Sequence, residues 1–282
     1  MNKKFRLLSI ILLTILMIGV LSGCNNKEAN RSSIETINNR GKIKIGVFSD
    51  KPPFGYIDEN GENQGFDVYI AKGLAKELLG KEDGVEFVLV EAASRVEYLE
   101  SGKVDLILAN FTVTEERKEK VDFANPYMKV SLGVVSKDDA LITDVSQLSG
   151  KTLIVNKGTT AETYFTKNHP EITLLKFDQN TEAFNALKDG RGDALAHDNT
   201  LLFAWAIENE GFTTGIETLG DLDYIAPAVQ KGNTELLNWV NDTLSKLGDE
   251  SFISKAYDAT LLPTYGDHID KASVIIEGGK VE

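Results

Sequence analysis

The sequence contains few of the residues that bind metals or form disulfides. Its 282 residues include one cysteine and three histidines, and the histidines (His169, His197 and His268) lie far apart in the chain. A single cysteine excludes a disulfide within the chain, and scattered histidines offer no metal-ligand spacing. The sequence therefore predicts neither a metal site nor a bound cofactor.

Positive charge and proline are also scarce. The chain has 30 lysines and arginines against 43 aspartates and glutamates, and the resulting net charge of −13 argues against nucleic acid as a partner. With only 6 prolines, 42% hydrophobic and 26% charged residues, the composition excludes collagen-like and disordered chains. The length of 282 residues favours about two globular domains with sizeable cores.

The N-terminus has the pattern of an export signal. A basic head at residues 3–6 precedes an uncharged apolar run at residues 7–20, which is too short for a typical membrane span. The next four residues, Leu-Ser-Gly-Cys at 21–24, resemble the lipobox of bacterial lipoproteins. This resemblance implies that residues 1–23 are a signal peptide, which is removed, and that Cys24 is then acylated. An ordinary signal peptide with an incidental cysteine is the alternative.

Residues 24–33 are polar and lack apolar periodicity, which is typical of a tether between a lipid on Cys24 and a folded body. Such a lipid would hold the protein at the outer face of the cell membrane. The predicted location is therefore extracytoplasmic, which excludes cytosolic enzymes and transcription factors.

Beyond residue 40, short apolar strands alternate with segments of helical periodicity. The predicted strands are 43–47, 85–90, 104–109, 152–155, 172–177 and 194–196. The predicted helices are 65–79 (closed by Gly80), 95–100, one from about 160, 181–188 and 199–207. Strands separated by helices of this length imply parallel βαβ units and therefore an α/β fold class.

Two segments, 102–110 and 190–198, share one pattern. Each begins with a glycine turn and an acidic residue, continues as a buried strand, and ends in a polar residue, Asn110 or Asp198. Two α/β lobes with polar groups at the C-terminal ends of their strands would place a ligand site between them. Because every α/β protein has such strands, the repeated pattern alone is weak support.

Polar residues near two helix starts are suited to an amino-acid ligand. Thr114 is a candidate N-cap, and Arg117 in the same turn presents a planar fork that fits a carboxylate, although composition alone favours an exposed helix arginine there. Thr159 and Thr160 bring amides and hydroxyls to the start of another helix. Asp198 is placed to accept an ammonium group. A guanidinium and a carboxylate on opposite lobes would bind both ends of an α-amino acid and hold the lobes closed.

From residue 41 to about residue 266, the chain resembles the polar amino-acid family of extracytoplasmic solute-binding proteins of ABC importers. The motifs that carry the resemblance are Ile45-Gly46-Val47, Pro52-Pro53-Phe54, Gly65-Phe66-Asp67-Val68, residues 112–117 (Thr-Val-Thr-Glu-Glu-Arg), Val121-Asp122-Phe123, Pro126-Tyr127 and Gly158-Thr159-Thr160. The resemblance implies a periplasmic-binding-protein-like fold, in which two α/β lobes are joined by two crossover segments.

The same resemblance implies where the chain crosses between the lobes. The crossovers are expected at about 127–134 and 223–229, so that the first lobe is discontinuous. The expected first lobe is 34–130 plus 226–282 with helices at 229–248 and 251–257, and the expected second lobe is 131–225.

The resemblance also implies roles for the predicted site residues. Arg117 would bind the α-carboxylate, with help from Thr112 and from the amide or hydroxyl of Thr160. Asp198 and the backbone carbonyl of Asn110 would take the α-ammonium.

Within this family, the likeness is strongest to cysteine-binding lipoproteins. It is carried by residues 48–56, 108–112 and 197–205. Phe54 would line the side-chain pocket near the mouth of the cleft. Arg95 also occurs in relatives that bind aspartate or glutamate, where it meets the side-chain carboxylate; an arginine can hydrogen-bond a thiolate but suits an acid better. L-cysteine is thus the expected ligand, with aspartate, glutamate or another small polar amino acid as alternatives.

The expected function is that of a monomeric, lipid-anchored receptor that is not an enzyme. It would deliver its amino acid to an ABC permease driven by a cytoplasmic ATPase. A cyclohexadienyl dehydratase-like enzyme is an alternative that requires a further acid or base in the cleft. The sequence offers no clear extra carboxylate for that role, although Asp50 and Glu91 are unplaced. A surface adhesin is a third possibility.

Overall fold

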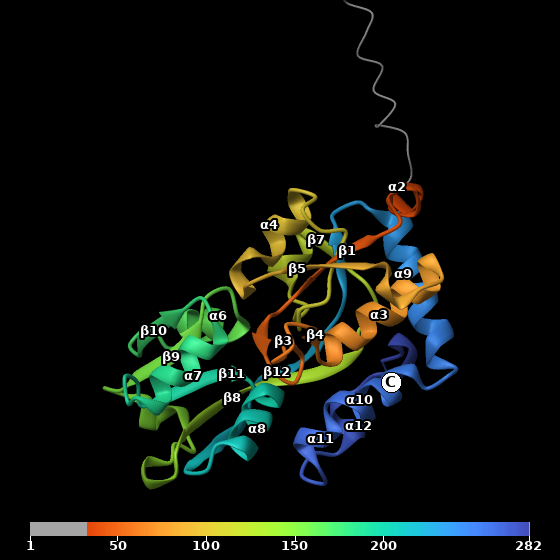
Figure 1. Ribbon diagram of the computed structural model, residues 1–282. Coiled ribbons are helices and arrows are strands. Elements are labelled where there is room, and N and C mark those ends of the chain that lie inside the picture. Colours follow the sequence, from red (N-terminus) through yellow and green to blue (C-terminus); the bar gives the residue numbers. More distant parts are fainter. Residues whose placement is uncertain (1–32, 282) are drawn as a thin grey trace, which may run out of the picture.

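The computed structural model describes residues 33–281, which form two lobes side by side (Figure 1). The expected signal peptide, Cys24 and nearly all of the tether lie outside these residues. None of the helices in the described part combines the length and apolar character of a membrane span.

The first lobe is built on a five-stranded sheet. Its strands, in spatial order, are β5 (Val85–Leu89), β1 (Ile43–Val47), β6 (Leu106–Ile107), β13 (Ala228–Gln230) and β7 (Val121–Phe123). β1 is parallel to β5 and β6, whereas β13 is antiparallel to β6 and β7. The larger helices of this lobe are α3 (Phe66–Leu79), α9 (Thr234–Gly248) and α10 (Phe252–Thr260).

Helix α3 shows how local sequence forms this lobe. Its apolar residues Phe66, Ile70 and Leu74 recur at helical spacing and are fully buried in the core. Gly80 ends the helix in the left-handed conformation, φ 74°, and donates its N–H to the carbonyl of Lys76, as its C-cap position predicts.

Shorter elements complete the first lobe. They are the helices α2 (Ser33–Arg40), α4 (Arg95–Glu100), α5 (Glu115–Lys118), α11 (Leu262–Tyr265) and α12 (Lys271–Val274), the 3₁₀ turns η2 (Glu82–Gly84), η3 (Ala92–Ser94) and η6 (Glu277–Gly279), and a small sheet of β2 (Asp50–Lys51), β3 (Gly55–Ile57) and β4 (Asn63–Gln64).

The second lobe contains another five-stranded sheet. Its strands, in spatial order, are β10 (Thr173–Phe177), β9 (Thr152–Asn156), β11 (Ala194–Asp198), β8 (Met128–Lys137) and β12 (Phe212–Ile225). β9 is parallel to β10 and β11, and β8 is antiparallel to β11 and β12. Its helices are α6 (Thr160–Asn168), α7 (Asn180–Lys188) and α8 (Asn199–Glu208), with 3₁₀ turns η4 (Asp138–Ala140) and η5 (Val145–Leu148).

Strands β8 and β12 are the two crossover segments. They run side by side between the lobes in Figure 1 and pair in antiparallel register from Met128 opposite Ile225 onwards. At the first lobe, Thr112 forms a bridge with Ile225. The predicted α/β fold of two lobes joined by two crossovers is therefore confirmed, although each five-stranded sheet is mixed rather than wholly parallel. The expected lobe boundaries at residues 130 and 225 fall on this pair of strands.

Two predicted elements differ from the structure. The strand expected at 104–109 is limited to Leu106–Ile107, and the chain bends at Asn110, which adopts a left-handed φ of 45°. The helix expected from residue 229 begins at Thr234, because residues 228–230 form β13 and pair with β6 and β7. That pairing joins segments more than 100 residues apart, so local periodicity could not reveal it.

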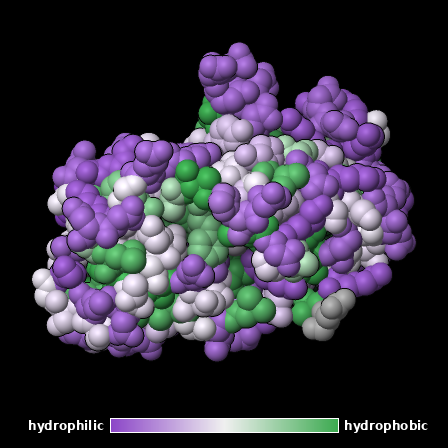
Figure 2. Space-filling model, turned by 90° about the horizontal axis from the view of Figure 1, so that it is seen from below, coloured by the Kyte–Doolittle hydropathy of each residue, from purple (hydrophilic) through white to green (hydrophobic). Residues whose placement is uncertain are grey.

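On the face shown in Figure 2, hydrophilic residues cover most of the rim, while apolar residues gather in smaller patches toward the middle. The large apolar side chains of the described residues are mostly buried, and the largest hydrophobic cluster includes residues of both lobes.

A buried carboxylate supports the bend at Asn110. Asp67, in the first turn of α3, accepts hydrogen bonds from the Tyr127 hydroxyl (2.7 Å) and from the Asn110 amide (2.8 Å). Burial raises the pKa of Asp67 to about 6, against the opposing effect of the Tyr127 hydrogen bond. Because the folded state favours the protonated form of Asp67, this group adds to the free energy of unfolding fully below the ordinary carboxyl pKa. That stabilisation is lost as the pH rises through about 6.

We expect Tyr127→Phe to destabilise the protein more at high pH than at low pH. Above about pH 6, Asp67 is ionised, and the hydrogen bond that the variant loses is one to a charged carboxylate. The free energy of unfolding should therefore fall by about 1.5–3 kcal/mol. Below that pH the carboxyl is neutral, and the loss should be about 1 kcal/mol. Denaturant unfolding at pH 5 and pH 8 measures both values. Tyr69→Phe, on the same helix as Asp67, is the control. An equal loss at both pH values in Tyr127→Phe would contradict the hydrogen bond from Tyr127 to an ionised Asp67.

Candidate ligand-binding site between the lobes

A cavity lies where the two lobes face each other. The residues that line it are Phe48, Lys51, Ala92, Arg95, Asn110, Thr112 and Arg117 from the first lobe and Thr159, Thr160, His197 and Asp198 from the second. The structure thus brings together every predicted ligand residue except Phe54. The free space at its centre is about 10 Å³, which is room for one water-sized group, because charged side chains from both lobes meet there.

Arg117 projects from the short helix α5 toward the second lobe. Thr114 caps this helix as predicted, since its hydroxyl accepts a hydrogen bond from the Arg117 amide (3.2 Å). The guanidinium donates through Nη1 to the Thr112 carbonyl (2.6 Å) and through Nη2 to the Gly158 carbonyl of the second lobe (2.9 Å). The interpretation of Arg117 as an exposed helix arginine, which composition favoured, is therefore wrong. Burial lowers the pKa of Arg117 to about 10, so the group stays charged at neutral pH.

Arg95 is a second, more deeply buried guanidinium. Its Nε donates to the Ala92 carbonyl (3.0 Å), and its Nη1 donates to the carbonyls of Ala109 (3.0 Å) and Asn110 (3.2 Å). Its Nη2 donates to the same Gly158 carbonyl that Arg117 contacts (3.2 Å). The carbonyl expected to take the ligand ammonium, that of Asn110, therefore already accepts from Arg95. Bonds from all three nitrogens fix the plane of this group.

Asp198 is the carboxylate of the second lobe. It ends β11 at the start of α8 and forms an ion pair with Lys51, whose Nζ lies 2.8 Å from its Oδ2. Burial disfavours the charge on Asp198, but the ammonium of Lys51 holds the pKa of Asp198 well below its usual range. Burial lowers the pKa of Lys51, and Asp198 opposes that effect. The site thus contains one strongly ionised acceptor for a cation.

Lys51 is a site residue that sequence reasoning missed. Its side chain is 1% exposed, and its Nζ also donates to the Asn110 Oδ1 (2.5 Å). A lysine in a polar turn before two prolines is ordinarily exposed, so its local context gave no reason to place it in a site. The only available signal was its position inside segment 48–56, which carried the resemblance to cysteine-binding proteins.

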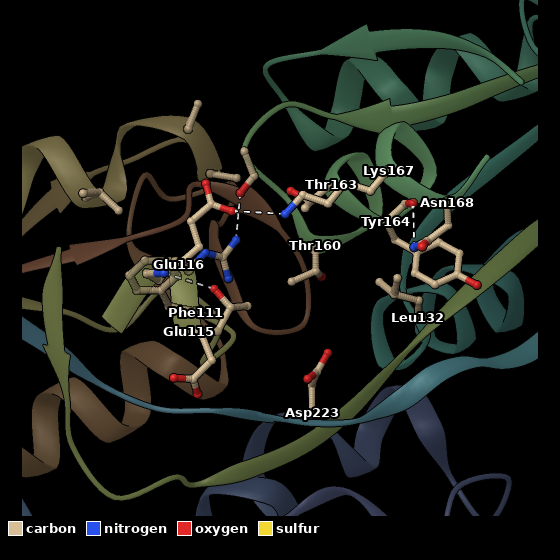
Figure 3. A pocket seen from close by; sticks show the side chains of 16 residues that line it. Phe111, Glu115, Glu116, Leu132, Thr160, Thr163, Tyr164, Lys167, Asn168 and Asp223 are labelled. Carbon is tan, nitrogen blue, oxygen red and sulfur yellow. Dashed lines mark hydrogen bonds and ion pairs between the residues drawn. The ribbon is translucent and has the colours of Figure 1, made fainter. Parts of the chain in front are cut away.

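Thr159 and Thr160 form the start of α6. The Thr159 hydroxyl donates to the Asn156 carbonyl (2.6 Å) and accepts from the Glu162 amide (3.2 Å), so it caps the helix. Its polar group is therefore used within the second lobe. Thr160, one residue further, lines both the cavity and the groove beside it (Figure 3).

The predicted role of Phe54 in lining the pocket is corrected by the structure. Phe54 is fully buried in the core of the first lobe, together with Phe66 of α3. A turn in which its amide donates to the Lys51 carbonyl (2.9 Å) reverses the chain and sends the ring inward. The ring that lines the cavity is instead Phe48.

A wider groove of about 520 Å³ adjoins the cavity (Figure 3). Arg117 and Thr160 line both spaces. At the groove, Glu116 of the first lobe and Lys167 of the second lie 3.6 Å apart, and Asp223 projects from β12. The groove follows the boundary between the lobes and adjoins the cavity at its Arg117 end.

The lobes also touch away from the cavity. Asp50 accepts hydrogen bonds from the Asn180 side chain (3.0 Å) and the Thr181 amide (3.2 Å), both in the first turn of α7. Gly158 approaches the first lobe so closely that a Cβ atom there would lie 2.5 Å from the Ala93 Cα. The lobes are therefore closed on each other, with the backbone at Gly158 in close contact with the backbone at Ala93.

We expect Gly158→Ala to prevent this closure while leaving both lobes folded. The three atoms nearest to the added Cβ all belong to Ala92 and Ala93 of the opposite lobe, so the affinity for the expected ligand, L-cysteine, should fall at least tenfold in titration calorimetry. Gly150→Ala is a matched control, because Gly150 has the same left-handed φ of 73° but open space around its Cβ position. Equal affinities for the two variants would show that the Gly158 contact does not limit binding.

Known proteins resemble the chain over nearly its whole folded length. Residues 43–260 match the family described as bacterial extracellular solute-binding proteins, family 3. A solved structure of a solute receptor for L-cysteine from Neisseria gonorrhoeae is 63% identical, covers 86% of this chain and 99% of its own, and has a TM-score of 0.85. A cysteine-binding protein from Campylobacter jejuni is 57% identical, covers 88% of this chain and 100% of its own, and has a TM-score of 0.87. A glutamine-binding protein of an ABC transporter from Bacillus subtilis is 33% identical over 91% of this chain and 96% of its own. The chain therefore belongs to family 3 of the bacterial extracellular solute-binding proteins.

Proposed function

We propose that this protein is the receptor of an ABC importer and binds L-cysteine between its lobes. The observation that carries the proposal is that Arg117 and Asp198, on opposite lobes, line one cavity. The names of the two similar solved structures support cysteine as the ligand. The receptor would hand its amino acid to a membrane permease powered by an ATPase.

Arg117 suits the carboxylate end of the ligand. The two hydrogen bonds that its guanidinium donates, to Thr112 and to Gly158, use one N–H group on each Nη atom. A guanidinium has five N–H groups in a planar fork, so donors remain on Nε and on both Nη atoms for the two oxygens of a carboxylate. The bonds to Thr112 and Gly158 keep that fork in one orientation, which reduces the entropy lost on binding.

Asp198 suits the ammonium end. A carboxylate accepts about four hydrogen bonds, and Lys51 uses only part of that capacity through Oδ2. The ligand ammonium would share or replace this ion pair. Since Lys51 comes from the first lobe and Asp198 from the second, the ligand would enter a contact that already joins the lobes.

The N-terminal motif indicates the cellular location of the receptor. We propose that Cys24 carries a lipid that anchors the receptor at the outer face of the membrane, with residues 24–33 as the tether. The lipobox resemblance supports this, together with the extracellular character of the family. A receptor held there would meet its permease by diffusion in two dimensions.

Aspartate or glutamate is the second candidate ligand. Arg95 and Lys51 are buried cations beside the cavity, and they favour a negatively charged side chain. The dehydratase alternative is less well supported, because the two unassigned carboxylates, Asp50 and Glu91, do not line the cavity. Asp50 is used in the contact with α7 instead.

We expect Arg117→Ala to weaken L-cysteine binding by about 3–5 kcal/mol, because the ligand carboxylate would be desolvated without its partner. Titration calorimetry under reducing conditions measures the loss. Lys118→Ala removes a neighbouring exposed cation paired with Glu115 and should bind normally. Near-normal affinity of the Arg117 variant would refute the carboxylate assignment.

Asp198→Asn should weaken binding strongly, since it removes the acceptor for the ligand ammonium. The substitution also leaves Lys51 without its ion-pair partner, so thermal unfolding must show that the variant is folded. An independent arm uses the unaltered protein with 3-mercaptopropionate, which lacks the ammonium and should bind poorly. Asp178→Asn, at an exposed ion pair with Lys157, is the control. Tight binding of 3-mercaptopropionate would show that Asp198 does not bind the ligand ammonium.

A further inference from the structure

The groups that line the cavity carry more positive than negative charge. The cations are Lys51 on β2, Arg95 on α4 and Arg117 on α5, and the one carboxylate among the lining residues is Asp198 on β11. The ligand carboxylate and ammonium cancel each other, so a neutral amino acid leaves this excess unchanged. Charges buried together in a medium of low dielectric repel strongly, and a further anion would relieve that repulsion.

The remaining titratable groups do not remove the excess. Asp67 on α3 lies behind the cavity wall and is bound to Tyr127 and the Asn110 amide, so counting it as ionised still leaves one net positive charge. His197 on β11 lines the cavity, and burial lowers its pKa, so it is neutral at pH 7. Asp223 on β12 and Glu116 on α5 face Arg117 from the groove, outside the cavity lining.

Two phenylalanine rings lie close to the three cations. The Phe111 ring centroid lies 4.7 Å from the Arg117 guanidinium carbon and 4.4 Å from that of Arg95. The Phe48 ring centroid lies 5.6 Å from the Arg95 guanidinium carbon and 5.4 Å from the Lys51 Nζ. If Arg117 binds the ligand carboxylate, then Arg95 and Lys51, which both lie beside Phe48, are the cations that remain for the ligand side chain.

We propose that the site binds L-cysteine as its thiolate, with Lys51 and Arg95 stabilising the sulfur anion. The proposal rests on the proposed function and names the ionisation state that this site selects. On binding, the S–H bond breaks, its electron pair stays on sulfur, and the proton passes to the buffer. Free cysteine thiols ionise near pH 8.5, so most of the ligand in neutral solution carries that proton beforehand. Nearby cations lower a thiol pKa by several units, which supplies the driving force.

Calorimetry with the unaltered protein tests the proposal. L-cysteine is titrated at pH 7 in phosphate and in Tris, whose ionisation enthalpies differ, and the difference in binding heat gives the number of protons released. We expect about one proton per cysteine and, between pH 7 and 8, a rise in affinity of about eightfold, because the thiolate fraction rises by that factor. L-aspartate, already ionised, is the control and should release none if it binds. L-serine, of similar size but without an ionisable thiol, should bind far more weakly.

The outcomes separate this inference from the proposed function. Tight cysteine binding without proton release, and with equal affinity at pH 7 and 8, would overturn the thiolate while leaving the receptor function intact. Failure of cysteine to bind at any pH would overturn both.

A pair of variants tests the role of Lys51. Lys51→Met should release clearly less than one proton per cysteine, whereas Lys157→Met, at an exposed lysine, should match the unaltered protein. Unchanged proton release and affinity in a folded Lys51→Met protein would remove Lys51 from the stabilisation of the sulfur.

Discussion

The pairing of first-lobe cations with second-lobe oxygens is the interaction on which this structure depends. The Gly158 carbonyl accepts from both Arg95 and Arg117, and Asp198 binds Lys51. Burying a charge costs several kcal/mol unless a partner compensates for it, and each lobe alone lacks part of that compensation. Closing the lobes therefore gives these cations their hydrogen-bond and ion-pair partners. The binding site and the closed arrangement of the lobes are consequences of one set of contacts.

The same cluster explains why a ligand would favour the closed form. Three cations held around two aromatic rings are stabilised only in part by cation–π contacts, which contribute about 0.5–2 kcal/mol each. An anionic ligand adds the missing negative charge at the centre, where contacts from both lobes converge. Ligand binding and closure are then coupled, because the open form would offer the ligand only half of these groups. The paired crossover strands β8 and β12 would guide this movement, since they are the continuous backbone that links the two sheets.

Elements governed by neighbouring residues could be predicted closely. The amphipathic helix α3 with its Gly80 cap and the Thr114 cap at α5 were all evident from residue types a few positions apart. Elements governed by distant partners could not. Residues 228–230 form a strand because they pair with β6 and β7, and the turn after Lys51 places Phe54 in the same hydrophobic cluster as Phe66 of α3.

The sequence by itself determined the α/β class, the export signal pattern and the types of chemical group available to the site, since these follow from periodicity and residue type. It also indicated that Arg117 and Asp198 act together. Only the tertiary structure decided which atoms meet. Arg117 reaches the Gly158 carbonyl across 41 residues, and Lys51 reaches Asp198 across 147. Local pattern carries no information on such partners, because topology alone brings them within hydrogen-bonding distance. That is why a lysine in an ordinary polar turn became a buried member of the site.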